Sequence, residues 1–169
     1  MEVALDPSKS SRDDSFGEFF EAEYEGLFRT LLLMVGSRSE ADELAQEAMA
    51  RVYERWDRVR EMGSPAGYAY TIAFNLDRRR LRHLLMERRQ ILPRLGRTPS
   101  TEVIDARRDI RAALLRLPVP LREAVVLTGW LDLSAEEAGH ILGIQAVSVR
   151  GRLHRARQQL RDLLEETDG

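Results

Sequence analysis

The chain has 169 residues, of which 43% are hydrophobic and 32% charged, and its formal net charge is −2. Such a composition fits one or two small folded domains. A membrane span is not expected because the chain has no long apolar run, and a signal peptide is not expected because the chain does not start with a basic and then an apolar stretch. There are no cysteines and only three histidines, far apart in sequence, so we expect a cytoplasmic protein with no disulfide, no metal and no cofactor.

Helical periodicity runs through the first half of the chain. An apolar stripe predicts a helix from Phe16 to Val35, closed by Gly36. A second helix is expected to begin at Ser39, with Asp42 three residues later as its capping partner. The pair Ser64-Pro65, a capping serine before a proline at the first helical position, predicts the start of a third long helix.

A linker is predicted at residues 92–102, where proline, glycine, serine and threonine gather without apolar periodicity. The second half should hold a helix over residues 102–116, a break at Pro118 and Pro120, a helix through Val126 and a turn at Gly129. The run from Ser134 to Glu137 forms a capping box, and Gly143 ends the short helix that it begins. A last helix is expected over residues 146–164. Short helix, tight turn and arginine-rich helix together have the layout of a helix-turn-helix.

The charges are segregated along the chain, although they nearly cancel in sum. Residues 1–62 hold eight basic and fifteen acidic residues, whereas residues 78–97 hold eight arginines and the single acid Glu87. Residues 150–161 add five arginines and no acid. The planar guanidinium group of arginine matches the geometry of a phosphate, so two basic blocks predict two surfaces that face phosphates. For either block alone, the alternative is a solvated helix face.

The second half resembles region 4 of the extracytoplasmic-function (ECF) sigma factors of bacterial RNA polymerase. The matching runs are Leu117-Pro118, Leu133-Ser134-Ala135-Glu136-Glu137, Leu142-Gly143-Ile144 and Val149-Arg150-Gly151-Arg152-Leu153-His154-Arg155-Ala156-Arg157. The resemblance implies recognition of the minus-35 promoter element and contact with the polymerase flap. The residues expected to face the major groove are Ser148, Arg150, Gly151, His154 and Arg155. Gly139, where the family usually has alanine, and Val147-Ser148, in place of Gly-Thr, depart from the pattern.

The first half resembles region 2 of the same family, in the same order along the chain. The run Asp42-Glu43-Leu44-Ala45-Gln46-Glu47-Ala48-Met49 is similar to the helix that meets the clamp helices of core polymerase, which makes Asp42, Gln46 and Glu47 candidates for docking. The segment from Ser64 to Arg82 is similar to the part that captures the minus-10 element. Its candidates are Ser64, Tyr68, Asn75, Arg78, Arg79 and Arg82. An amide can read a base edge, and arginines can hold the displaced strand.

The sequence therefore predicts an all-α protein of two small helical domains joined by a flexible linker. Region 2 is placed at 14–91, the linker at 92–102 and region 4, with the helix-turn-helix, at 103–165. The expected function is that of a sigma factor without enzymatic activity, with core RNA polymerase and promoter DNA as partners and neither membrane nor small-molecule substrate. Relatives are commonly held inactive by an anti-sigma factor, which makes such a protein a further candidate partner.

Two other functions remain open from the residues alone. The chain could be a stand-alone helix-turn-helix regulator whose amino-terminal half senses a ligand or dimerises. It could also be a helical nuclease or hydrolase, but no helix presents a convincing set of inward acids for a catalytic metal.

Overall fold

A computed structural model describes residues 7–88 and 106–165, and within them it contains helices and no strand. The first half holds α1 (Pro7–Val35), α2 (Arg38–Glu54), α3 (Trp56–Val59) and α4 (Pro65–Arg88). The second half holds α5 (Ala106–Arg116), α6 (Val119–Val125), the π-helix η1 (Val126–Trp130), α7 (Ala135–Leu142) and α8 (Ala146–Glu165). The all-α prediction is confirmed, whereas the predicted linker, 92–102, lies outside the described residues.

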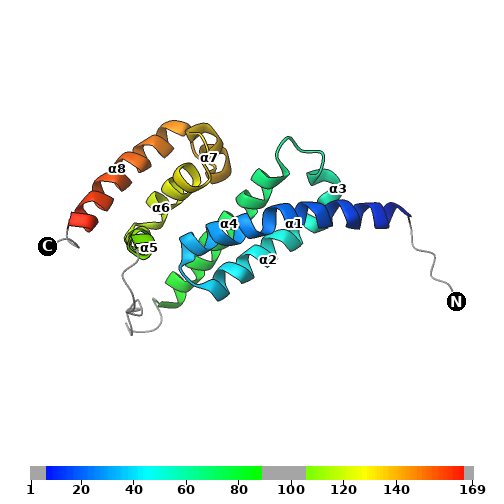
Figure 1. Cartoon of the computed structure of the whole chain (residues 1–169), viewed down its shortest axis with the longest axis horizontal. Coiled ribbons are helices and arrows are strands. Elements are labelled where there is room, and N and C mark those ends of the chain that lie inside the picture. The colour runs from blue at the N-terminus through cyan, green and yellow to red at the C-terminus, as the bar shows by residue number, and fades with distance from the viewer. Residues whose placement is uncertain (1–6, 89–105, 166–169) are drawn as a thin grey trace.

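The first four helices form one bundle, which we call the first module (Figure 1). Helices α1 and α2 lie along each other because small residues of α2 allow a close approach. The α2 residues that are buried are Ala41, Leu44, Ala45, Ala48, Met49 and Val52. Short α3 closes one end of the bundle with Trp56, whose indole N–H donates to Ser15 Oγ at 2.8 Å. Burial of these apolar surfaces is the main force that holds the bundle together.

The second module, α5 to α8 with η1, packs against one end of the first (Figure 1). One continuous core cluster contains Leu31 of α1 and Phe74 of α4 together with Leu127 of η1 and Ile141 of α7. A smaller cluster around Leu117 receives Leu33 from α1. The two modules therefore share apolar surface, and they do not stand apart as two separate globules.

Three local predictions need correction. Helix α1 begins at Pro7 and not at Phe16, and α2 begins at Arg38 because Ser37, not Ser39, is its N-cap. Ser37 Oγ accepts the Glu40 N–H, since it stands directly after Gly36 and is the first side chain that can reach that donor. Gly129 lies in η1, not in a turn.

The π-helix replaces the predicted turn because the hydrogen bonding that follows α6 shifts by one residue. The Leu131 N–H donates to the Val126 carbonyl at 3.2 Å, an i to i−5 bond. The chain then turns at Asp132, whose φ of 55° is positive, and enters α7.

Candidate nucleic-acid interface

Local bonds fix the helix-turn-helix at both ends of α7. Ser134 Oγ accepts the Glu137 N–H at 3.1 Å, and the Glu137 carboxylate accepts the Ser134 N–H at 2.8 Å, as the predicted capping box requires. Gly143 ends the helix with φ 67° and ψ 32°, the left-handed conformation that glycine adopts without strain. The turn brings the Ile144 carbonyl oxygen so close to Gly139 that a Cβ on Gly139 would lie only 2.6 Å from it.

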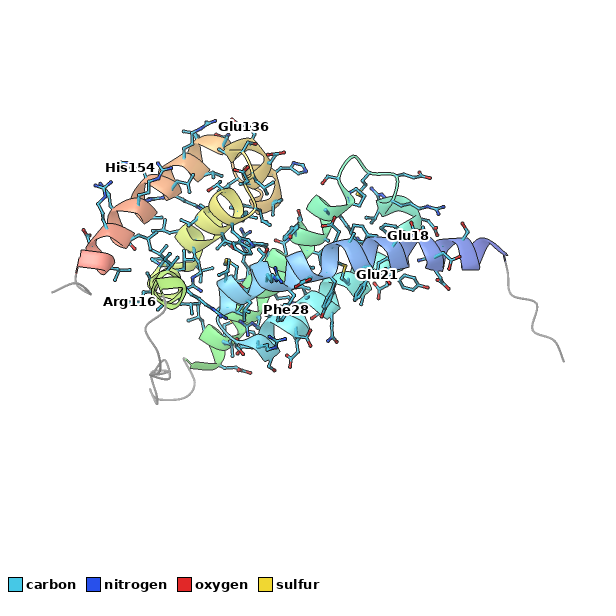
Figure 2. The ribbon with its side chains drawn as sticks, in the orientation of Figure 1. Glu18, Glu21, Phe28, Arg116, Glu136 and His154 are labelled. Carbon is cyan, nitrogen blue, oxygen red and sulfur yellow. The ribbon has the colours of Figure 1, made fainter. Side chains whose placement is uncertain are left out.

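Helix α8 buries one side and exposes the other. Val149 and Ala156 are fully buried between α8 and the rest of the second module. The five residues predicted to face the major groove are all exposed: Ser148, Arg150, Gly151, His154 and Arg155. In Figure 2, His154 projects from the outer side of α8, away from the first module. Burial thus leaves an exposed arginine-rich surface, which we call the α8 face.

Arg150 on this face has an internal partner. Its guanidinium donates to Glu136 at the start of α7, and both side chains are more than half exposed. A backbone N–H in the first turn of α7 and the bond from Arg150 hold the pKa of Glu136 below its usual range. Because the pair is exposed, it is weak and can open when another anion approaches Arg150.

The predicted minus-10 residues lie along α4, which we call the α4 face. Asn75, Arg79 and Arg82 are exposed, whereas Arg78 is half-buried. Ser64 is the cap of this helix, as predicted, because its Oγ accepts the Gly67 N–H at 3.0 Å. It is exposed, but its oxygen already has a structural role.

The two tyrosines of α4 have different environments. Tyr70 is buried, with 8% of its surface exposed, and burial raises its pKa. Tyr68 is half-buried, and its hydroxyl accepts a bond from Arg55 Nη1 at 3.3 Å. Only Tyr68 therefore keeps ring surface that could stack on a base.

Arg78 does not point into solvent with its neighbours. Its Nε and Nη2 donate to the two carboxylate oxygens of Glu123 at 2.7 and 3.1 Å, and its Nη1 donates to the Leu142 carbonyl at 3.3 Å. Glu123 belongs to α6 and Leu142 to the last turn of α7. One predicted DNA contact thus joins the two modules.

The predicted docking residues lie on one side of α2. Asp42 accepts the Tyr24 hydroxyl at 2.5 Å and the Gln46 Nε2 at 2.9 Å, while Glu47 pairs with Arg51 at 2.6 Å. Gln46 and Glu47 are exposed and Asp42 is half-buried. Burial of Tyr24, followed by its bond to Asp42, raises the pKa of the tyrosine to about 12. The structure therefore brings the three predicted residues together as a polar surface, which we call the α2 face.

Sequence reasoning missed the charges at the junction of the modules, the buried Asp77 and Glu123 and the half-buried Arg122 and Arg152. Arg122 donates to the carbonyls of Leu114, Leu115 and Leu117 and to that of Met34 in the first module. The sequence did hold one signal for this junction: Arg122 and Glu123 stand between the buried residues Leu121 and Ala124. An apolar helix face seldom carries two charges unless they have partners inside the protein.

Within the residues that the structure describes, no group of three or more histidine or acidic side chains could hold a metal ion. None of the described helices is both long enough and apolar enough to cross a membrane.

The two halves match two family models. Residues 19–84 match Sigma-70 region 2, and residues 107–160 match Sigma-70, region 4. The chain is 31% identical over 156 residues to the RNA polymerase sigma-E factor of Streptomyces avermitilis, with 90% of this chain and 87% of that one covered. The chain belongs to the ECF sigma factors. Such a protein directs RNA polymerase to promoters, so the stand-alone regulator is not favoured.

Further comparisons agree with this family. The ECF sigma factor SigE of Mycolicibacterium smegmatis is 34% identical over 159 residues, which cover 89% of this sigma factor and 62% of that relative. The fold is that of the sigma factor RpoE from Bartonella quintana, solved with the anti-sigma factor NepR, with a TM-score of 0.75 at 24% identity over 89% of this chain and 97% of that one. CnrH, solved with the cytosolic domain of CnrY, gives a TM-score of 0.65 at 21% identity, with 91% and 90% covered.

Proposed function

We propose that this sigma factor divides promoter recognition among its three polar faces. The α2 face docks on the clamp helices of core RNA polymerase, the α4 face receives the minus-10 element, and the α8 face reads the minus-35 element in the major groove. The observation that carries the proposal is the exposure of two arginine-rich helix faces on separate modules, in the family's order along the chain. The second module also contacts the polymerase flap.

The α8 face suits duplex DNA. Its arginines can donate two parallel bonds to a guanine edge or hold a phosphate, and the hydroxyl of Ser148 can donate to a phosphate oxygen. The first turn of a recognition helix is the part that reaches base edges. Arg150 would exchange its weak bond to Glu136 for a contact with DNA.

The α4 face suits an opened strand. Asn75 can donate to and accept from a base edge, while the half-buried ring of Tyr68 can stack on a base. Arg79 and Arg82 would hold the phosphates. The three kinds of contact together stabilise bases that have left the duplex.

In vitro transcription with core polymerase tests the assignment. We expect Arg155→Ala to reduce initiation at a promoter that needs its minus-35 element by about tenfold, since one good base or phosphate contact contributes on the order of 1–3 kcal/mol. Arg161→Ala, a change of the same kind near the end of α8, is the matched control and should leave initiation unchanged. Equal loss in both variants would contradict a specific role for the α8 face.

Docking is tested by retention on core polymerase. We expect Glu47→Gln combined with Gln46→Ala to weaken retention, whereas Glu54→Gln, an exposed change at the end of the same helix, should not. Full retention of the double variant would place the docking surface elsewhere.

The proposal treats this sigma factor as a binding subunit without enzymatic activity, and no part of its action requires a cofactor. We place it in the cytoplasm, where the chromosome and polymerase are. An anti-sigma protein is a further proposed partner, because the RpoE and CnrH structures were solved with the anti-sigma factor NepR and with the cytosolic domain of CnrY. Co-purification from the native cell, followed by identification of the bound proteins, tests this point.

A further inference from the structure

A single buried carboxylate joins the two modules. Glu123 has 2% of its surface exposed and accepts two bonds from Arg78 of α4, while Arg152 of α8 lies 3.6 Å from its Oε2. Two guanidinium groups, one from each module, therefore share one anion. Arg78 also donates to the Leu142 carbonyl at the carboxyl end of α7, where a positive charge is favoured.

The same contacts remove Arg78 from the predicted DNA-binding surface. A carboxylate presents two oxygens to a guanidinium much as a phosphate does, so Glu123 occupies Arg78 in the way a DNA phosphate would. Asn75, Arg79 and Arg82 line the groove whose other wall contains Glu123 and Arg152. The α4 face thus borders the second module: Arg78 is held by it, while Asn75, Arg79 and Arg82 remain exposed beside the groove.

We propose that Glu123 is an internal latch that holds the free chain closed, and that the latch must open before the α4 face can bind promoter DNA. Opening moves the second module away from α4 and releases Arg78 for the displaced strand. Core polymerase, which holds the two modules at separate sites, provides the free energy for opening. The inference rests on the proposed role of the α4 face for its consequence in DNA binding, but the latch itself does not depend on that role.

The latch has a clear electrostatic basis. Removing the charge of Glu123 leaves two half-buried arginines facing each other without an anion, which favours separation of the modules. Nearby Asp77 cannot replace it, since Arg80 already pairs with Asp77 at 3.3 Å. We therefore expect Glu123→Gln, which keeps the shape of the side chain, to shift the population toward an open arrangement.

The absence of cysteine from the chain makes a distance measurement simple. Cysteines introduced by Glu21→Cys on α1 and Gln158→Cys on α8, both at exposed positions, would carry a donor and an acceptor dye. We expect the wild-type background to give high energy transfer, and Glu123→Gln to add a population of lower transfer. Core polymerase should move both proteins to the low-transfer state. Glu54→Gln, which removes one exposed charge away from the junction, should behave as wild type.

Unchanged energy transfer in a folded Glu123→Gln variant would overturn the latch. If that variant does not fold, as judged by circular dichroism, Arg78→Gln supplies the same test, because it removes the guanidinium that the first module gives to Glu123. A shift in the same direction is then expected, and no shift would again overturn the proposal. These outcomes need no DNA, so they are distinguishable from a failure of the proposed function.

Binding to a single-stranded minus-10 oligonucleotide tests the consequence. If the closed form outnumbers the open form by about ten to one, opening raises the apparent affinity by about tenfold. We expect this gain in Glu123→Gln and not in Glu54→Gln. Altered energy transfer without a gain in affinity would leave the latch standing and contradict the proposed role of the α4 face.

A second inference rests on a separate observation, the apolar side chain of Val147 in the first turn of α8. Val147 is 65% exposed and is flanked by the exposed Ser148, so it packs on little within the chain. Apolar side chains at this place in a recognition helix can contact the C5-methyl group of thymine. We infer that Val147 is a specificity residue that reads a thymine methyl in the minus-35 element, given the proposed role of the α8 face.

The test uses holoenzyme and a promoter that it has selected in vitro. Each minus-35 thymine is replaced in turn by deoxyuridine, which lacks only the methyl group. We expect one replacement to weaken binding of wild-type holoenzyme by about fourfold, the effect of one buried methyl group, and to have no effect on Val147→Ala. The inference would be overturned if the deoxyuridine replacements weakened binding of both proteins equally, or of neither protein. Promoter binding by the holoenzyme would still support the proposed function.

Discussion

Arg122 shows how much of the junction depends on one side chain. Its guanidinium donates to four backbone carbonyls, three in the second module and that of Met34 in the first. These carbonyls lie at or near helix ends, where backbone N–H partners run out, although the Leu114 carbonyl also accepts the Leu117 N–H at 3.1 Å. Burial lowers the pKa of Arg122, but a guanidinium stays charged at any ordinary pH, so the bonds persist across the physiological range.

We expect Arg122→Met to lower the free energy of unfolding by about 3 kcal/mol or more, because four carbonyls lose a charged donor while the apolar stem is kept. Urea unfolding followed by circular dichroism measures this change. Arg58→Met, an exposed substitution in α3, is the control and should cost less than about 0.5 kcal/mol. A similar loss in both variants would mean that the Arg122 bonds contribute little.

Tyr24 gives a prediction in pH. Its pKa is raised from 10.0 to about 12, first by burial and then by its bond to Asp42, so the folded state holds a proton that the unfolded state loses. Stability from this group is fully present below pH 10 and falls as the pH rises from about 10 to about 12. The difference in unfolding free energy between wild type and Tyr24→Phe should therefore shrink across that window, and a constant difference would contradict the raised pKa.

At the scale of the element, the sequence predicts caps well where the signal is local. Ser64 and the Ser134 to Glu137 box were identified because a cap needs only residues three positions apart. The prediction of Ser39 as the cap of α2 was wrong. Ser37 and Ser39 stand close together in sequence, and only the path of the chain after Gly36 decides which of them caps the helix. The π-helix η1 was not predictable either, because its bonding depends on how α6 and α7 pack.

Gly139 is the departure from the family pattern that the structure explains. A Cβ there would lie 2.6 Å from the Ile144 carbonyl oxygen, so the turn after α7 comes closer than an alanine allows. We expect Gly139→Ala to lower the free energy of unfolding by about 1–2 kcal/mol, as overpacking outweighs the better helix propensity of alanine.

Gly17 in α1 is the matched control, because no atom lies within 4 Å of its added Cβ. Gly17→Ala should raise stability by about 0.5–1 kcal/mol. Thermal unfolding of Gly139→Ala and Gly17→Ala measures the direction in which each substitution changes stability. A gain in stability for Gly139→Ala would mean that the turn relaxes at little cost.

For the molecule as a whole, the sequence predicted the long helices and the exposed α8 face but not how the modules meet. Two domains with a linker were expected, and the residues of the α8 face are exposed as predicted. The junction was missed because its parts are far apart in sequence: Arg78 meets Glu123 across 45 positions and Arg122 meets Met34 across 88. Periodicity reports which side of a helix is buried, but it carries no information on the partner.

The shared core predicts that the two modules unfold cooperatively. Leu33 of α1 packs against the cluster of Leu114, Leu117 and Leu121 in the second module, and Leu160 of α8 packs on the same cluster from within that module. If the modules unfold together, calorimetry of wild type should give one transition whose calorimetric and van't Hoff enthalpies agree. Leu160→Ala should lower the transition temperature and leave a single transition, because it weakens only the interior of one module.

Leu33→Ala removes the same kind of side chain from the same cluster but across the junction. We expect its transition to broaden or split, with the second module unfolding first, because the loss of about 2 kcal/mol falls on the contact that couples the two modules. Equal enthalpies and a single sharp transition in Leu33→Ala would show that the polar contacts of Arg122 and Glu123 couple the modules without help from this apolar contact. A split transition in both variants would instead mean that the second module is the weaker unit whatever its contact with α1.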